Sequence, residues 1–141
     1  MTNQRSALEY CVIRVAPDIE RAEFLNAGVI LICRATRFLD ARIHLNHVRL
    51  RALWPRMTAH EVALIERHLA LIPLICAADP AGGPIARLDL GERWHWLTAP
   101  ASTIVQPGPV HTGLAGDPAA ELDRLLERVV VSNNALQVEM D

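Results

Sequence analysis

The chain has 141 residues, of which 51% are hydrophobic and 21% are charged, and its formal net charge is −2. This length fits one domain, and the composition excludes a disordered, low-complexity or collagen-like chain. All 14 basic residues are arginine, and they are outnumbered by 16 carboxylates. Because the arginines are scattered, the composition also excludes a generally basic nucleic-acid-binding coat.

Neither a membrane span nor a metal site is expected. The longest apolar run, residues 69–78, contains a proline and falls short of the ~20 residues of a membrane-spanning helix. Residues 1–6 are polar and lack a signal-peptide pattern. Cys11, Cys33 and Cys76 fit no zinc or redox spacing and lie in apolar segments typical of buried cysteine. We therefore expect a reduced, cytoplasmic protein without metal or cofactor.

Four segments have the apolar or alternating patterns of β-strands. They are residues 8–15, 29–33, 38–44 and 102–106. The first three follow one another without a long helix between them, so we expect antiparallel pairing, with residues 34–37 as a hairpin connection. The predicted fold is α+β: a small, mostly antiparallel sheet of about four strands, packed with three to four helices on one face.

Four predicted helices begin at side chains that cap helix N-termini. Their cap residues are Asn46, Thr58, Asp89 and Asp117. We expect Pro73 to kink or end the second of these helices. That helix carries an apolar stripe of Val62, Ile65, Leu69, Ile72 and Cys76. Residues 1–131 are predicted to form one domain, followed by a loose tail at 132–141, where Leu136 and Val138 are able to add an edge strand.

The corner between the first two strands is the principal candidate site. It contains Arg14, Asp18, Glu20, Arg21, Glu23 and Asn26. We predict one helical turn at residues 19–24, capped by Asp18, with Asn26 and Gly28 taking the positive φ that leaves it. Glu20 and Glu23 then share a face of the turn, and Arg14 is placed to pair with either carboxylate.

Two interpretations of this corner are open. As a site, its two carboxylates, arginine and asparagine suit a metal with oxygen ligands or a cationic group. As structure, Asp18, Asn26 and Gly28 satisfy the backbone of the corner, and an Arg14–Glu23 pair fixes it. We favour the structural interpretation, because ion-pair networks also resemble sites.

A secondary candidate comprises Gln106, His111 and Thr112, in a segment rich in proline and glycine. An extended loop there is able to offer backbone amides to an anion and a titratable imidazole, although we favour a solvent-exposed loop stiffened by prolines. The pair His44 and His47 lacks a third zinc ligand, and His60 and His68 point to different sides of a helix, so surface positions are expected. We predict that Trp94 is part of the core and that Trp96 is an anchor that faces a partner.

The segment from Arg14 to Val29 follows the pattern R-x-x-P-D-x-E-R-x-E-F-x-N-x-G-V. It resembles the opening motif of the bacterial domain-of-unknown-function family 3037. Residues 96–100, 102–106 and 117–118 also resemble this family, so the likeness covers nearly the whole chain. The family has no assigned activity and supplies no catalytic residues. Its members look like small cytoplasmic proteins often encoded beside a HipA-like kinase, which implies a protein partner.

The sequence contains no phosphate-binding loop, dinucleotide fingerprint, C-x-x-C pair, H-E-x-x-H or G-x-S-x-G motif. The first hypothesis is therefore a non-enzymatic protein-interaction or regulatory domain, whose partner is such a kinase or a second copy of the chain.

Two alternatives stay open, and with them the question of whether the protein is an enzyme. One is a small hydrolase or phosphate-handling enzyme that uses Arg14, Glu20 and Glu23, with His111 in the same cleft. The weaker one is nucleic-acid binding, against which the net charge weighs. Its candidate residues are Arg49, Arg51 and Arg56.

Overall fold

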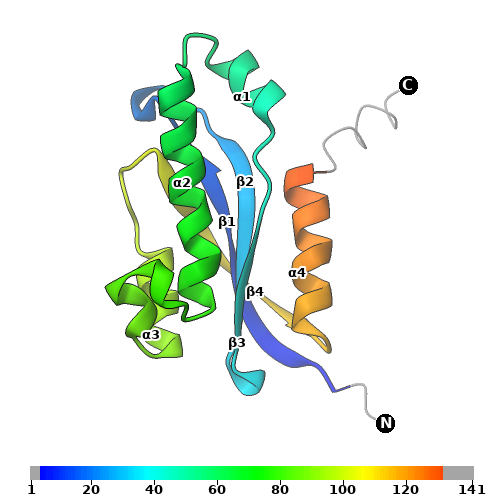
Figure 1. Ribbon diagram of the computed structural model, residues 1–141. Helices are drawn as coiled ribbons and strands as arrows, with labels where there is room; N and C mark the ends of the chain where they lie inside the picture. Colours follow the sequence, from blue (N-terminus) through cyan, green and yellow to red (C-terminus); the bar gives the residue numbers. More distant parts are fainter. Residues whose placement is uncertain (1–3, 132–141) are drawn as a thin grey trace, which may run out of the picture.

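The computed structural model describes residues 4–131, and the predicted tail lies outside them, together with the suggested edge strand at Leu136 and Val138. Within this range one antiparallel sheet has the order β3-β2-β1-β4 (Figure 1). Its strands are β1 (Ser6–Val15), β2 (Leu25–Cys33), β3 (Phe38–Ile43) and β4 (Val105–Ala115). The helices are α1 (His47–Leu53), α2 (Ala59–Cys76), α3 (Leu90–Thr98) and α4 (Pro118–Leu126). The predicted α+β class is confirmed.

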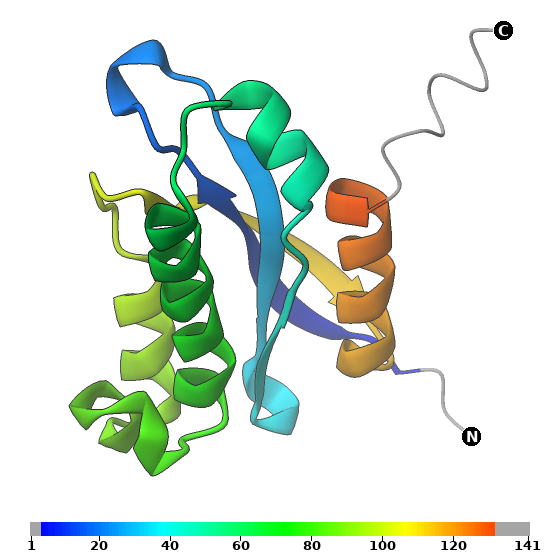
Figure 2. The same cartoon turned by 45° about the horizontal axis from the view of Figure 1, so that its top comes forward.

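Helices cover both faces of the sheet, so the prediction of helices on one face is wrong. α2 and α3 lie on one side and α4 on the other (Figure 2). The side chains of β2 explain this, because Ile30 and Ile32 join the core beneath α2, whereas Val29 and Leu31 join a second core beneath α4. A continuous apolar strand is buried on both faces and needs a cover on each.

α4 is attached to its face of the sheet by apolar packing and by Arg42 on β3. Leu122 and Leu125 are buried in the second core. The guanidinium of Arg42 donates to Asp40 at 2.6 Å and to Asp123 of α4 at 2.8 Å, and the hydrogen bond with Asp40 raises the pKa of Arg42. Exposed ion pairs stabilise little, so the buried leucines contribute most of the attachment.

The predicted cap at the start of each helix is confirmed. Asn46, Thr58, Asp89 and Asp117 all accept hydrogen bonds from backbone N–H groups of the first turn. The stripe on α2 is buried as predicted, but Pro73 does not end the helix, which continues to Cys76. The last turn is held because Ile75 and Cys76 are buried and their carbonyls accept hydrogen bonds from Arg93.

The fourth strand differs from its predicted range of 102–106. It begins at Val105 and runs to Ala115, so Pro107, Pro109 and His111 lie in a strand rather than a loop. Proline is tolerated there because β4 is an edge strand, where an outward-facing N–H is not needed. The pairing with β1 shifts register between Cys11 and Ile13, opposite the prolines.

The corner between β1 and β2 is tighter than predicted. Its helical turn spans only Ile19–Arg21, and the side chain of Asp18 makes no capping hydrogen bond. Ala22 takes the positive φ of 56°, whereas Asn26 and Gly28 lie in β2, so the expectation for these two residues is wrong. Because the turn is only three residues long, the chain changes direction at Ala22, before it reaches Asn26 or Gly28.

Candidate functional site

Arg14 lies at the centre of a polar row on the sheet. It pairs in register with Asn26 of β2 and Gln106 of β4, and opposed residues of antiparallel strands share a face. Its Cζ lies 4.0 Å from the centroid of the Phe24 ring. Among residues 4–131 it forms no ion pair, and its buried Nε has no hydrogen-bond partner. The predicted pairing of Arg14 with Glu20 or Glu23 is therefore wrong.

Within residues 4–131, none of the carboxylates of the predicted corner forms an ion pair with Arg14. Glu23 lies 2.8 Å from Arg21 (Oε1 to Nη2), an ion pair without hydrogen-bond geometry, and Glu20 is exposed. Asp18 and Arg21 line a shallow cavity of about 430 Å³ with Trp54 and residues 55–57. Asn26 instead donates to the carbonyl of Val129 at 3.1 Å, which joins β2 to the turn after α4.

The three residues of the secondary candidate, Gln106, His111 and Thr112, do not lie together. Gln106 is the register partner of Arg14, whereas His111 lies against Tyr10 with ring centroids 5.2 Å apart. Tyr10 and Arg14 are four positions apart on β1, about 13 Å at the rise of a strand. Thr112 pairs with Glu9, one position farther still. His111 is therefore not brought to the corner, and the convergence that the hydrolase alternative requires is absent from the described residues.

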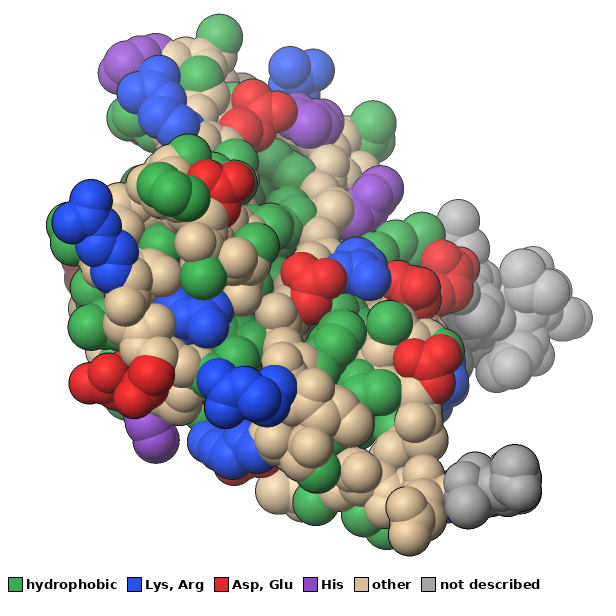
Figure 3. Space-filling model, turned by 60° about the horizontal axis from the view of Figure 1, so that its bottom comes forward, with side chains coloured by type: hydrophobic (Ala, Val, Ile, Leu, Met, Phe, Trp, Pro, Cys, Tyr) green, Lys and Arg blue, Asp and Glu red, His purple; other side chains and the backbone are tan. Residues whose placement is uncertain are grey.

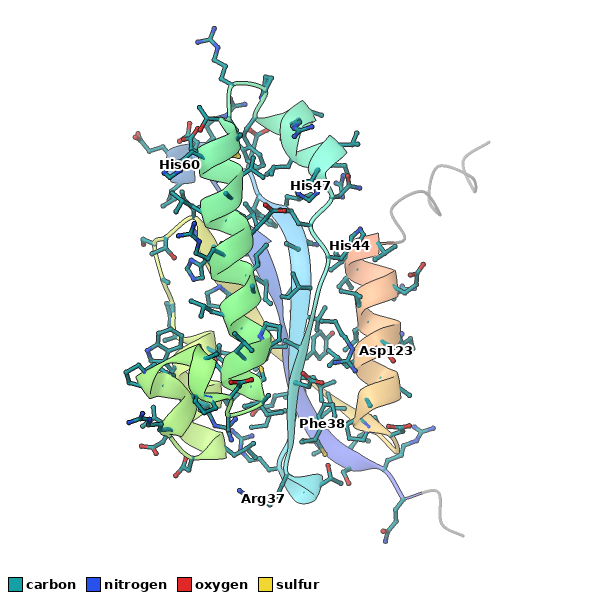
Figure 4. The ribbon with its side chains drawn as sticks, in the orientation of Figure 1. Arg37, Phe38, His44, His47, His60 and Asp123 are labelled. Carbon is teal, nitrogen blue, oxygen red and sulfur yellow. The ribbon has the colours of Figure 1, made fainter. Side chains whose placement is uncertain are left out.

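No group of three or more metal-ligating side chains occurs within residues 4–131. His44 directly follows β3, His47 is the first residue of α1, and His60 lies in the first turn of α2 (Figure 4). The predicted surface positions are confirmed, since these three and His68 are all exposed. His47 contacts Glu66 at 2.9 Å (Nε2 to Oε2). The three cysteines are free and buried as predicted, and burial raises the pKa of both Cys11 and Cys76 to about 12.

An apolar surface around His68 was only partly predicted. Two cavities of about 350 and 420 Å³ share His68, Thr103 and Val105 in their linings. The floor of the first is the main core, including Ile13 and Ile72, and its rim carries Trp96, which is 51% exposed. We call this surface the His68 groove. It comprises Ile19, Leu64, His68, Trp96, Thr103 and Ile104.

Of the residues of the His68 groove, Trp96 is predicted from the sequence to face a partner, whereas Leu64 and Ile104 are not predicted from it. Leu64 lies outside the buried stripe of α2 and is exposed. An apolar residue away from the apolar stripe of an amphipathic helix was the sequence signal by which it could have been found. Among the described residues, no arginine or carboxylate lines either cavity. Figure 3 shows a face of the molecule on which arginine and carboxylate side chains are interspersed with hydrophobic ones.

The pKa of His68 yields a testable pH dependence. Partial burial lowers this pKa below its ordinary value, so the unfolded chain holds the proton more tightly than the folded one. Stability is therefore expected to fall as the pH drops through the region just below ~6.5, the ordinary histidine pKa, and to be regained above it. Urea unfolding of the protein and of His68→Gln across this region measures the effect. An equal slope with pH in both proteins would contradict it.

Together these features define a small antiparallel α+β domain whose described residues form an apolar groove and leave Arg14 without an ion-pair partner. Residues 10–130 match the family described as "Protein of unknown function (DUF3037)", and the chain belongs to this family. The resemblance carried by the Arg14–Val29 motif is thus confirmed. Neither a curated protein nor a solved structure matches the chain. Among the described helices, none has the length and apolar character to cross a membrane.

Proposed function

We propose that this protein is a non-enzymatic interaction domain that binds an apolar segment of another protein in the His68 groove. The observation that supports it most is the pair of adjoining cavities, flanked by the exposed side chains of Leu64, Trp96 and Ile104. Contiguous exposed apolar surface is costly in water and is typical of interaction sites.

The chemistry of the groove selects the kind of partner. Its first cavity reaches the core side chains Ile13 and Ile72, so an inserted apolar side chain is buried against packed hydrocarbon. Trp96 at the rim has the residue type that most often anchors interfaces. Because no charged arginine or carboxylate lines either cavity, an acidic or basic segment gains no partner there, whereas leucine or aromatic side chains do. The first partner to test is the HipA-like kinase encoded beside many members of the family.

The experiment is co-expression with a HipA-like kinase from the same genome, followed by size-exclusion chromatography at micromolar concentration. Leu64→Asp is expected to abolish co-elution, because it places a charge in the apolar lining. The matched control is Val48→Asp, at a position that is 80% exposed on α1 and outside both cavities. Co-elution is expected to survive in this control.

Three results would overturn the proposal. If the unmodified proteins elute separately, the kinase is not the partner. If Leu64→Asp still co-elutes with the kinase, the groove is not the contact surface. A dimer of the chain alone that Leu64→Asp dissociates assigns the groove to a second copy instead.

A further inference from the structure

We propose that Arg14 is the centre of an oxyanion-binding site on the face of the sheet opposite α2, for a carboxylate or a phosphate group. This inference is independent of the proposed function, because Arg14 lines neither cavity of the His68 groove. Ile13 and Val15 point into the core beneath α2, so Arg14 between them points away from it.

The guanidinium of Arg14 is held in place from two directions. The ring of Phe24 stacks against it, with 4.0 Å from Cζ to the ring centroid. On β4, Gly108 leaves the space that the guanidinium uses, since a Cβ on this glycine would lie 3.0 Å from Nε and 3.2 Å from Cζ of Arg14. A guanidinium whose plane is fixed loses little freedom when it binds a carboxylate or phosphate with two parallel N–H donors.

The positive charge of Arg14 is uncompensated within residues 4–131. Its two register partners, Asn26 and Gln106, are uncharged, and each gives its amide N–H to a backbone carbonyl, of Val129 and Thr103 respectively. Several carboxylates of the described residues form ion pairs with other arginines instead. Glu9 pairs with Arg34, Glu23 with Arg21, and Asp40 and Asp123 with Arg42.

The unpaired charge points to a ligand on energetic grounds. The Nε of Arg14 is buried and makes no hydrogen bond with any residue of the described range 4–131. A partly desolvated cation without an anion is costly, and an oxyanion that accepts its N–H groups removes part of that cost. Arg42, the other arginine in the strands, shows the contrast, because two aspartates satisfy it. The ligand is therefore a molecule that supplies the oxyanion Arg14 lacks.

The test follows the side-chain Nε–Hε signal of Arg14 by NMR in the full chain, assigned by its loss in Arg14→Lys. Sodium phosphate and sodium succinate are titrated separately at constant ionic strength, adjusted with sodium chloride. We expect a saturable shift of this signal with at least one probe, and no saturable shift at Arg67, an exposed arginine of α2 that forms no ion pair within residues 4–131. Phe24→Leu is expected to weaken binding roughly two- to fivefold through loss of the cation–π contact.

The two arms identify the ligand class. Saturation by phosphate alone assigns a phosphate-bearing ligand, and saturation by succinate alone assigns a carboxylate. Arg14→Lys keeps the charge but loses the planar fork, so the response of the neighbouring Gly108 amide is expected to weaken or disappear. The proposal is overturned if Arg14 responds to both probes as weakly as Arg67, or if the Gly108 amide responds equally in Arg14→Lys.

Discussion

Replacing Arg93 with methionine is expected to lower the free energy of unfolding by roughly 2–4 kcal/mol. Arg93 lies in α3 and is only 8% exposed. Its Nη1 donates to the carbonyls of Ile75 at 3.1 Å and Cys76 at 2.7 Å, and its Nε donates to the carbonyl of Leu88 at 3.0 Å. One side chain therefore joins α3 to the end of α2 and to the connection between them.

The size of this effect follows from the end of α2. The last carbonyls of a helix have no partner within it, and a cation at this end also interacts favourably with the helix dipole. Methionine fills the space of the aliphatic part of Arg93 but donates no hydrogen bond. The carbonyl of Ile75 keeps the N–H of Ala78 as a donor, whereas those of Cys76 and Leu88 lose the hydrogen bond from Arg93, at a cost of ~1–3 kcal/mol for each one left unsatisfied.

Urea unfolding of Arg93→Met measures the loss, provided that the dependence on urea concentration is unchanged. The matched control is Arg67→Met, on the exposed side of α2, which is expected to change stability by less than ~0.5 kcal/mol. Arg93→Lys, which keeps a charge but not the fork, is expected to fall between the two. A loss for Arg93→Met no larger than that for Arg67→Met would show that the carbonyls find other donors.

Features encoded within a few residues could be predicted from the sequence. The capping box of Thr58 and Glu61 needs only a spacing of three, and the buried stripe of α2 needs only helical periodicity. Arg93 shows the limit of such prediction, because from the sequence alone an arginine in a short amphipathic helix cannot be distinguished from an exposed surface arginine. Its acceptors at Ile75 and Cys76 lie 18 and 17 positions away and are reached only when α2 and α3 pack together.

The candidate sites also depend on contacts between segments that are distant in sequence. The motif at the β1–β2 corner predicts a carboxylate beside Arg14, whereas its neighbours are Phe24 and Gly108, which is distant in sequence. His111 was assigned to a loop because Pro107 and Pro109 usually break strands. Whether a proline is tolerated depends on the strand being at an edge, a property of sheet order that no local pattern contains.

Gly28→Ala is expected to destabilise the domain by roughly 1–3 kcal/mol, as overpacking of a core does. Gly28 lies in β2 without positive φ, so alanine would otherwise be tolerated or even stabilising there. A Cβ on Gly28 would lie 2.7 Å from the carbonyl oxygen of Arg42, 2.8 Å from Cδ1 of Ile43 and 3.0 Å from Cδ1 of Ile13. The isoleucine side chains are able to rotate, but the carbonyl oxygen belongs to β3, which pairs with β2 at this position.

Gly91→Ala in α3 is the matched control, because the nearest atom to its added Cβ, Oδ1 of Asp89, is 3.9 Å away. Alanine in a helix is favoured over glycine by ~0.5–1 kcal/mol, so this variant is expected to be as stable as the original protein or more so. Thermal and urea unfolding of both variants separates crowding from the general effect of replacing glycine. Equal stability of Gly28→Ala and Gly91→Ala would mean that β3 moves away from β2 at little cost, and that the close approach at Gly28 does not fix the register of the two strands.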